Sequence, residues 1–264
     1  MQKKNVWIIV LTVLIFLSAA CLGVVSVYRV NFVTVNAPVV SVEAKDEAAA
    51  LQQKLFEAYE GENIFSTDET LALEIFQEFP YFKMTSFTKE YPNRIVIVAK
   101  EDVELFAFKK AEDSYYILGA DGMVLGERNS PTNRSDGASN IQVTGVEILA
   151  SIGQVAKNDE CLTWLYAFCE RASEQLGGIR KNVTAIEVLR PTSSVAEMMF
   201  KIHFREGVVA YVRNPSAYTL EKAEKLVEKY ESLSDSERLR GMIVLTENTQ
   251  SVIVDYVQDD LFKE

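Results

Sequence analysis

The hydrophobic pattern begins with an uncharged apolar run at residues 5–28, which Lys3 and Lys4 precede. As a helix rising 1.5 Å per residue, the run would reach roughly 36 Å, enough to cross a hydrocarbon core of about 30 Å. The lysines favour a cytoplasmic N-terminus. We therefore predict a transmembrane helix at residues 6–28, a cytoplasmic tail at residues 1–5, and the bulk of the chain outside the cell membrane.

The ends of this run carry residues typical of a membrane boundary. Trp7 and Tyr28 have amphipathic rings that favour the bilayer interface, and with Val6 they are the predicted membrane-anchor residues. Two alternatives stay open. The small residues at 18–20 are compatible with a cleaved signal peptide, although the apolar run is long for one. With Cys21 they also loosely resemble a lipidation motif, although Ser stands where Leu is usual.

Behind the run, apolar spacing predicts a small α+β unit at residues 29–100. One of the two β-branched segments beside Pro38 is expected to be a strand, and a helix is expected from Asp46. Ser66 and Glu69 have the spacing of a capping box and predict the start of a second helix. Two strands follow, so the predicted order is strand, helix, helix, strand, strand.

A second unit, predicted at residues 101–257, is richer in strands, and residues 258–264 form an acidic tail. Alternating apolar and polar positions predict strands at residues 104–108, 115–118, 123–125, 141–146, 183–189, 198–204, 208–212, 242–246 and 252–257. Helices are predicted at residues 159–176 and from Thr219. The buried stripe predicted for the second helix is Leu220, Ala223, Leu226, Val227, Tyr230 and Leu233, with its lysines and glutamates facing outward. The predicted fold class is α+β.

Composition limits the classes of function that are possible for this chain. The chain has 264 residues, of which 48% are hydrophobic and 25% charged, as in a folded globular protein. Its net charge of −11 repels phosphate backbones, so nucleic-acid binding is not expected. Cys161 and Cys169 are eight residues apart in a helical pattern. This spacing separates them by roughly 12 Å along the helix axis, which is beyond disulfide reach. Both are predicted to be packing residues.

Catalytic chemistry has little support in the sequence. His203 is the sole histidine and lies in an alternating strand, without a nucleophile motif beside it. Metal-ligand spacing and a phosphate-binding glycine run are also absent from the sequence. The chain has many carboxylates, so their number alone does not exclude a pair that acts as general acid and base. Their scatter on polar faces favours a solvated role instead. We predict no enzyme activity, cofactor, metal or small-molecule substrate.

The last predicted strand is the candidate binding site. A terminal strand at a sheet edge leaves N–H and C=O groups that another chain can pair with. An interior or covered strand is the alternative, and residues 95–99 are a second, weaker edge candidate. The predicted partner-binding residues are Val252, Ile253, Val254, Asp255, Tyr256 and Val257.

Three short motifs carry a family resemblance. They are Asn63-Ile64-Phe65 before the second helix, Tyr91-Pro92-Asn93 before a strand, and Tyr115-Tyr116-Ile117-Leu118 with Asp121-Gly122 in a hairpin. Together with the order of the units, they resemble the bacterial cell-division family FtsQ/DivIB. The chain departs from the family pattern at Gly119, where Asp is usual, and at the junction near residue 101, which lacks the usual Arg and Pro.

The resemblance implies a POTRA domain at residues 29–100 and a β domain at residues 101–257. It also implies a divisome scaffold at the septum, which binds FtsL and FtsB/DivIC through its last strands and helps to place and regulate septal peptidoglycan synthesis. The alternative function is a membrane-anchored extracytoplasmic binding or sensor domain for a cell-wall ligand.

Overall fold

The computed structural model describes residues 7, 11–18 and 26–258. Val6, Cys21, much of the predicted span at residues 6–28 and nearly all of the acidic tail lie outside the described residues. Residues 11–18 are helical, but among the described residues no helix is both long and apolar enough to cross a bilayer. The transmembrane helix and the lipidation of Cys21 therefore stay predictions.

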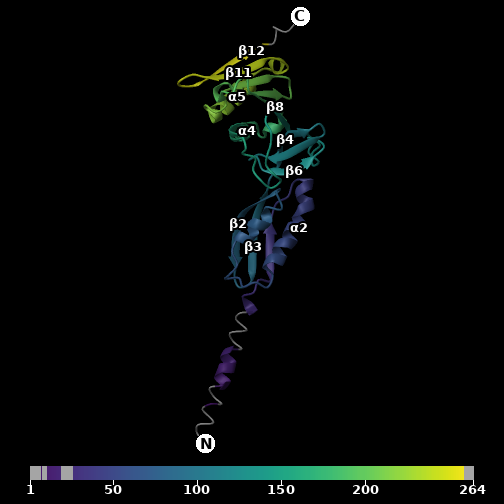
Figure 1. Ribbon diagram of the computed structural model, residues 1–264, viewed down its shortest axis with the longest axis vertical. Coiled ribbons are helices and arrows are strands. Elements are labelled where there is room, and N and C mark those ends of the chain that lie inside the picture. The colour runs from purple at the N-terminus through teal and green to yellow at the C-terminus, as the bar shows by residue number, and fades with distance from the viewer. Residues whose placement is uncertain (1–6, 8–10, 19–25, 259–264) are drawn as a thin grey trace. The chain divides into compact units, whose positions relative to one another are not determined.

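The chain divides into two compact units, and the division falls between Glu101 and Asp102 (Figure 1). The elements of unit 1 are β1 (Phe32–Asn36), α2 (Val42–Tyr59), α3 (Thr70–Phe76), β2 (Phe82–Glu90) and β3 (Arg94–Glu101). The three strands form a sheet in the order β1-β3-β2, in which β3 is parallel to β1 and antiparallel to β2. The predicted order of strand, helix, helix, strand, strand is confirmed.

Local chemistry explains where α2 begins. The Ser41 side chain accepts a hydrogen bond from the Ala44 N–H and caps the helix. The Glu101 carboxylate, at the end of β3, accepts hydrogen bonds from the backbone N–H groups of Val40 and Ser41. Leu51 and Leu55 then bury one face of α2. The helix therefore begins at Val42, before the predicted start at Asp46.

Two expectations for unit 1 are wrong. The capping box does not form, because the Ser66 hydroxyl donates to the Asn63 carbonyl while α3 begins only at Thr70. The Asp68 carboxylate instead accepts the Thr70 N–H at 3.0 Å. Residues 95–99 lie in β3, the central strand of the sheet, so they do not form an edge.

Unit 2 is built on a nine-stranded sheet with the order β12-β11-β10-β9-β8-β7-β4-β5-β6. The strands are β4 (Glu104–Ala111), β5 (Ser114–Gly119), β6 (Val124–Arg128), β7 (Ile141–Thr144), β8 (Val183–Leu189), β9 (Met199–Phe204), β10 (Val209–Arg213), β11 (Met242–Glu247) and β12 (Val252–Val257). The helices are α4 (Glu160–Leu176), α5 (Thr219–Ser232) and α6 (Asp235–Arg238), with short 3-10 turns at Ile179–Lys181 and Val195–Glu197. The mixed α+β fold with a large sheet is confirmed.

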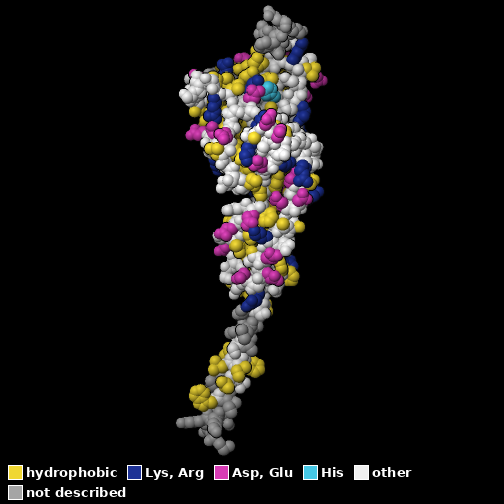
Figure 2. Space-filling model, turned by 45° about the vertical axis from the view of Figure 1, so that its right-hand side comes forward, with side chains coloured by type: hydrophobic (Ala, Val, Ile, Leu, Met, Phe, Trp, Pro, Cys, Tyr) yellow, Lys and Arg dark blue, Asp and Glu magenta, His cyan; other side chains and the backbone are white. Residues whose placement is uncertain are grey.

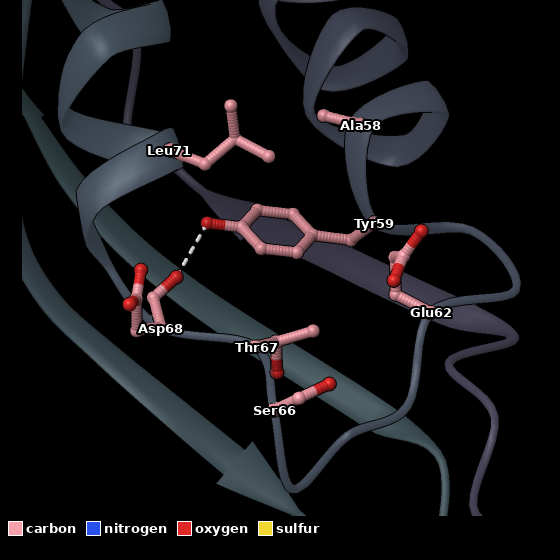
Figure 3. A pocket seen from close by; sticks show the side chains of 7 residues that line it. All are labelled: Ala58, Tyr59, Glu62, Ser66, Thr67, Asp68 and Leu71. Carbon is pink, nitrogen blue, oxygen red and sulfur yellow. Dashed lines mark hydrogen bonds between the residues drawn. The ribbon is translucent and has the colours of Figure 1, made fainter.

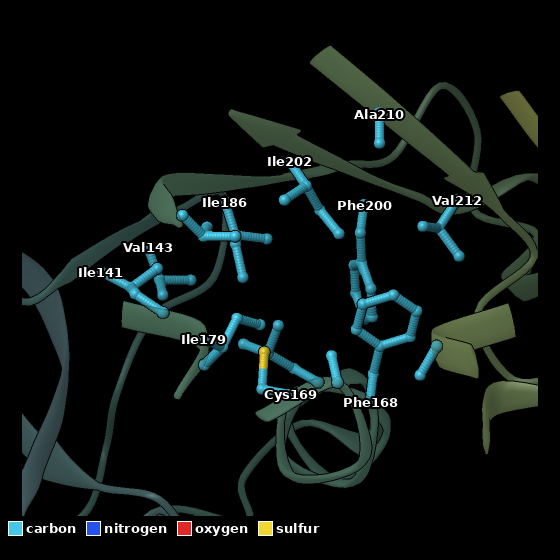
Figure 4. Packing of buried hydrophobic residues seen from close by; sticks show 14 of the residues in the cluster. Ile141, Val143, Phe168, Cys169, Ile179, Ile186, Phe200, Ile202, Ala210 and Val212 are labelled. Atoms are coloured by element: carbon cyan, nitrogen blue, oxygen red, sulfur yellow. The ribbon is translucent and has the colours of Figure 1, made fainter. Parts of the chain in front are cut away.

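The main core lies between this sheet and the helices α4 and α5. Phe168 of α4 meets Phe200 of β9 edge to face, with ring centroids 6.3 Å apart (Figure 4). Tyr230 of α5 stacks on Phe204 at 4.2 Å. Alternate residues of β8 to β11 are buried in this core, while those between them are more accessible on the other face. Both described cysteines are buried and free, one of them being Cys169 in Figure 4.

Candidate partner-binding edge

β12 lies at one edge of the nine-stranded sheet and pairs only with β11 among the described residues. The pairing is antiparallel, with Val244 opposite Asp255 and Thr246 opposite Ile253. The two strands are the yellow pair near the C-terminus in Figure 1. Within the part of the chain that the structure describes, one long side of β12 therefore has no strand neighbour.

The register shows which backbone groups face the open side. The Asn248 N–H donates to the Ser251 carbonyl at 3.0 Å, which identifies this pair as hydrogen-bonded. Because bonded and non-bonded pairs alternate in an antiparallel ladder, Ile253, Asp255 and Val257 are the residues of β12 that bond to β11. The N–H and C=O groups of Val252, Val254 and Tyr256 consequently point away from β11. An extended segment of another chain can pair with these groups.

The side chains of β12 alternate between two faces of the sheet. Val252 is buried, and Val254 and Tyr256 are partly buried against the main core. The other three side chains are exposed on the opposite face. These are the side chains of Ile253, Asp255 and Val257. The strand is thus fixed by one face and accessible on the other.

Tyr256 fixes the end of the strand. Its hydroxyl lies 2.9 Å from the Arg240 carbonyl oxygen and 3.0 Å from that of Glu237, so it donates to either. The Lys229 ammonium lies 5.7 Å from the centre of its ring. Burial raises the pKa of Tyr256. At Gly241, where φ is +123°, a Cβ atom would lie 2.5 Å from the Tyr256 hydroxyl oxygen, so this approach requires glycine.

Lys222 of α5 ties the helix to the turn end of the β11–β12 hairpin, where β11 finishes at Glu247. Its side chain is fully buried, and its ammonium donates to the carbonyls of Arg213 and Asn214 at 2.7 Å and to the Glu247 carboxylate at 2.8 Å. Burial lowers the pKa of Lys222, with Glu247 acting in the opposite direction. Burial also acts to raise the pKa of Glu247, but hydrogen bonds from Lys222 and Asn214 lower it overall. The hydrogen bonds and the ion pair together hold three segments at one end of the sheet.

A groove lies between α5 and β12, beside the open edge. Its volume is about 390 Å³. The groove is lined by Lys225, Glu228, Lys229, Ser232, Val252 and Val254. Valine side chains form its apolar part and charged side chains its rim, which suits an apolar side chain carried by an added strand.

His203 belongs to an ion-pair cluster on the accessible face of the sheet, where the cyan side chain in Figure 2 marks it. Its Nε2 atom lies 2.6 Å from a Glu187 oxygen, and the Lys201 ammonium lies 3.1 Å from the same oxygen. Burial acts to raise the pKa of Glu187, but these two hydrogen bonds lower it. Nowhere in the described ranges do three or more His, Cys, Asp or Glu side chains gather in a way that could hold a metal ion.

Unit 1 also has a small pocket of about 220 Å³ (Figure 3). It is lined by Ala58, Tyr59, Glu62, Ser66, Thr67, Asp68 and Leu71. The Tyr59 hydroxyl donates to the Asp68 carbonyl at 2.7 Å and accepts the Ala72 N–H at 3.0 Å. Burial raises the pKa of Tyr59 to about 12. Because both hydrogen bonds of this hydroxyl join α2 to the start of α3, Tyr59 is a structural link and is poorly suited to acid–base chemistry.

The structure places the six predicted binding residues together in β12, and their binding of a partner stays a prediction. Of the predicted anchor residues, Trp7 is exposed and Tyr28 contacts Phe65 in unit 1. The sequence analysis wrongly placed Lys222 on the outer face of α5 and Leu220 on the buried face. The missed signal is that Lys222 lies four residues before Leu226 and eight before Tyr230, a spacing that places the three side chains on one face of the helix.

Comparison with known proteins gives a partial match. No family model matches the chain. The cell division protein DivIB of Clostridium botulinum strain Hall is 34% identical over 73 residues, and DivIB of strain Loch Maree is 33% identical over 73 residues. Each match covers 28% of this chain and 28% of the relative's length. The similarity to the FtsQ/DivIB family is thus confirmed over that segment.

Proposed function

We propose, from the similarity to DivIB, that this protein is a scaffold of the bacterial cell-division machinery that acts by binding and not by catalysis. It is anchored in the cell membrane by the predicted span at residues 6–28, with both units outside and concentrated at the division septum. Its partners are membrane proteins of the FtsL and FtsB/DivIC type. Through them it helps to place and regulate septal peptidoglycan synthesis, while unit 1, as a POTRA domain, docks other division proteins.

The observation that carries this proposal is the open side of β12. An incoming strand gains backbone hydrogen bonds to Val252, Val254 and Tyr256, each contributing about 0.5–1.5 kcal/mol net. Several such bonds support binding, and the groove beside α5 adds apolar contact and selectivity. Because Asp255 is exposed on the edge strand, a partner segment with a basic residue at that register is favoured.

The test is capture of an FtsL–DivIC pair by the full chain in detergent. In the variant Val254→Pro, the outward-facing N–H of β12 is removed and the proline ring obstructs an added strand, while the bonds to β11 are kept. Val254→Thr is the matched control, because it keeps both the N–H and a β-branched side chain. We expect Val254→Pro to lose capture and Val254→Thr to retain it.

Equal capture by the two variants, with both folded as judged by circular dichroism, would reject strand addition at β12. Failure of the wild-type chain to capture the pair at all would reject the proposed partners. Binding of cell-wall fragments in its place would favour the sensor-domain alternative.

A further inference from the structure

Three aromatic rings lie in a row at one end of unit 1, with one pair stacked and the other tilted. Phe65 lies between the other two, with its ring centroid 4.9 Å from that of Tyr28 and 5.3 Å from that of Tyr91. Phe65 is 60% exposed and Tyr91 58% exposed. The rings come from the segment before β1, the connector between α2 and α3, and the β2–β3 turn. We call these three residues the aromatic stack.

The segment that carries Tyr28 is tied directly to unit 1. The Ile64 N–H donates to the Tyr28 carbonyl at 3.0 Å, and the Val30 N–H donates to the Glu62 carbonyl at 2.8 Å. One residue further, the Asn31 N–H donates to the Asn93 carbonyl at 2.9 Å. These bonds leave no slack linker between residue 28 and the folded unit. Since the predicted span ends at residue 28, the aromatic stack lies where the chain leaves the bilayer.

Long cationic side chains surround the same end of the unit. Arg29 follows Tyr28, the Lys89 ammonium lies 3.5 Å from the Phe65 carbonyl oxygen, and the Arg94 guanidinium lies 5.6 Å from the ring centre of exposed Phe32. Acidic residues accompany them in the same loops, namely Glu60, Glu62, Asp68, Glu69 and Glu90. The charge at this end is therefore not net positive, and we assign the attraction to lipid to aromatic contact. Amphipathic rings beside snorkelling cations suit the lipid headgroup region.

We propose that the aromatic stack rests in the headgroup region of the outer leaflet, with Phe65 in contact with lipid. Unit 1 is then held against the membrane by side-chain contact as well as by its covalent anchor, which limits its rotation about residue 28. Lipid is the occupant because the stack continues directly from the predicted span. The proposal rests on that span and is independent of partner binding at β12.

The test places a tryptophan reporter in the full chain, reconstituted into phosphatidylethanolamine–phosphatidylglycerol vesicles. Trp7→Phe first removes the tryptophan of the predicted span, which leaves Trp164 as a constant background. Phe65→Trp is the reporter. Val40→Trp is the matched control, because Val40 is 78% exposed and lies between β1 and α2, at the other end of β1. Emission is compared between ordinary lipids and lipids brominated along their acyl chains.

We expect a blue-shifted emission from Phe65→Trp and loss of most of its signal in brominated vesicles, with little change for Val40→Trp. Equal quenching of the two reporters would overturn the proposal. A Phe65→Trp shift seen only after division partners are added would assign the stack to a protein interface and also overturn it. Failure of the wild-type chain to float with vesicles would also overturn the proposal. The proposed function could still be tested separately, because capture through β12 is measured in detergent.

Discussion

Removal of the Lys222 ammonium is the sharpest perturbation of the end of the sheet that carries the binding edge. In Lys222→Met a side chain of similar length remains, but the carbonyls of Arg213 and Asn214 and the Glu247 carboxylate lose their donor. Breaking a buried ion pair costs about 3–5 kcal/mol when the remaining charge stays buried. The Glu247 side chain is 28% exposed and still accepts from Asn214, so part of that cost is recovered by hydration. We expect a loss of about 2–4 kcal/mol.

Urea unfolding of the full chain in detergent, followed by Trp164 fluorescence, measures this loss. Trp164 packs against the core of unit 2 and therefore reports on this unit. Lys225→Met is the matched control, because Lys225 lies one turn away on α5 and its ion pair with Glu228 at 2.7 Å is solvent-exposed. The control should leave the unfolding midpoint almost unchanged.

A double-mutant cycle with Glu247→Gln then isolates the coupling between the two side chains, expected at about 1–3 kcal/mol. If Lys222→Met destabilised the protein no more than Lys225→Met does, the buried ion pair would not be what holds α5 to the hairpin.

Two further predictions concern the same unit. Glu247 and Glu187 have a pKa below the ordinary value of 4.5, so their contribution to stability is present above that value and is lost as the pH falls through the lowered pKa. The urea midpoint should therefore fall as the pH drops below about 4.5, and a constant midpoint down to pH 3 would contradict this reasoning. Tyr256→Phe should cost about 0.5–1.5 kcal/mol in the same urea assay, because the carbonyls of Arg240 and Glu237 lose a donor, while partner capture persists. Complete loss of capture in that variant would show that the hydroxyl contacts the partner.

The strand pattern of unit 2 was readable from sequence because its strands alternate over a core on one face. Val252–Val257 follows β11 after a short turn, so a place beside β11 was predictable from local order. The order of the strands in the whole sheet was not predictable in this way, because β10 and β11 are parallel neighbours joined through α5. Such a crossover depends on long-range packing and leaves no local pattern.

The burial of Lys222 was missed for a related reason, although its spacing from Leu226 and Tyr230 indicated the buried face. A lysine beside a helical apolar stripe ordinarily faces water, and here its acceptors come from the end of β10, from the end of β11 and from Asn214, a residue at positive φ in the loop before α5. The capping box failed similarly, because the Ser66 hydroxyl is used in the turn that begins at Asn63. For Lys222 a local rule was overridden by an acceptor distant in the sequence, and for Ser66 by a competing local turn.

Hydrogen exchange at single amides of β12 tests the central claim most directly. In the free chain, the amides of Val252, Val254 and Tyr256 should exchange rapidly, while those of Ile253 and Asp255 are protected by β11. Addition of the FtsL–DivIC pair should protect the first three amides selectively. Slow exchange at Val254 in the free chain, or unchanged rates at all three amides in a confirmed complex, would contradict an open edge that receives a partner strand.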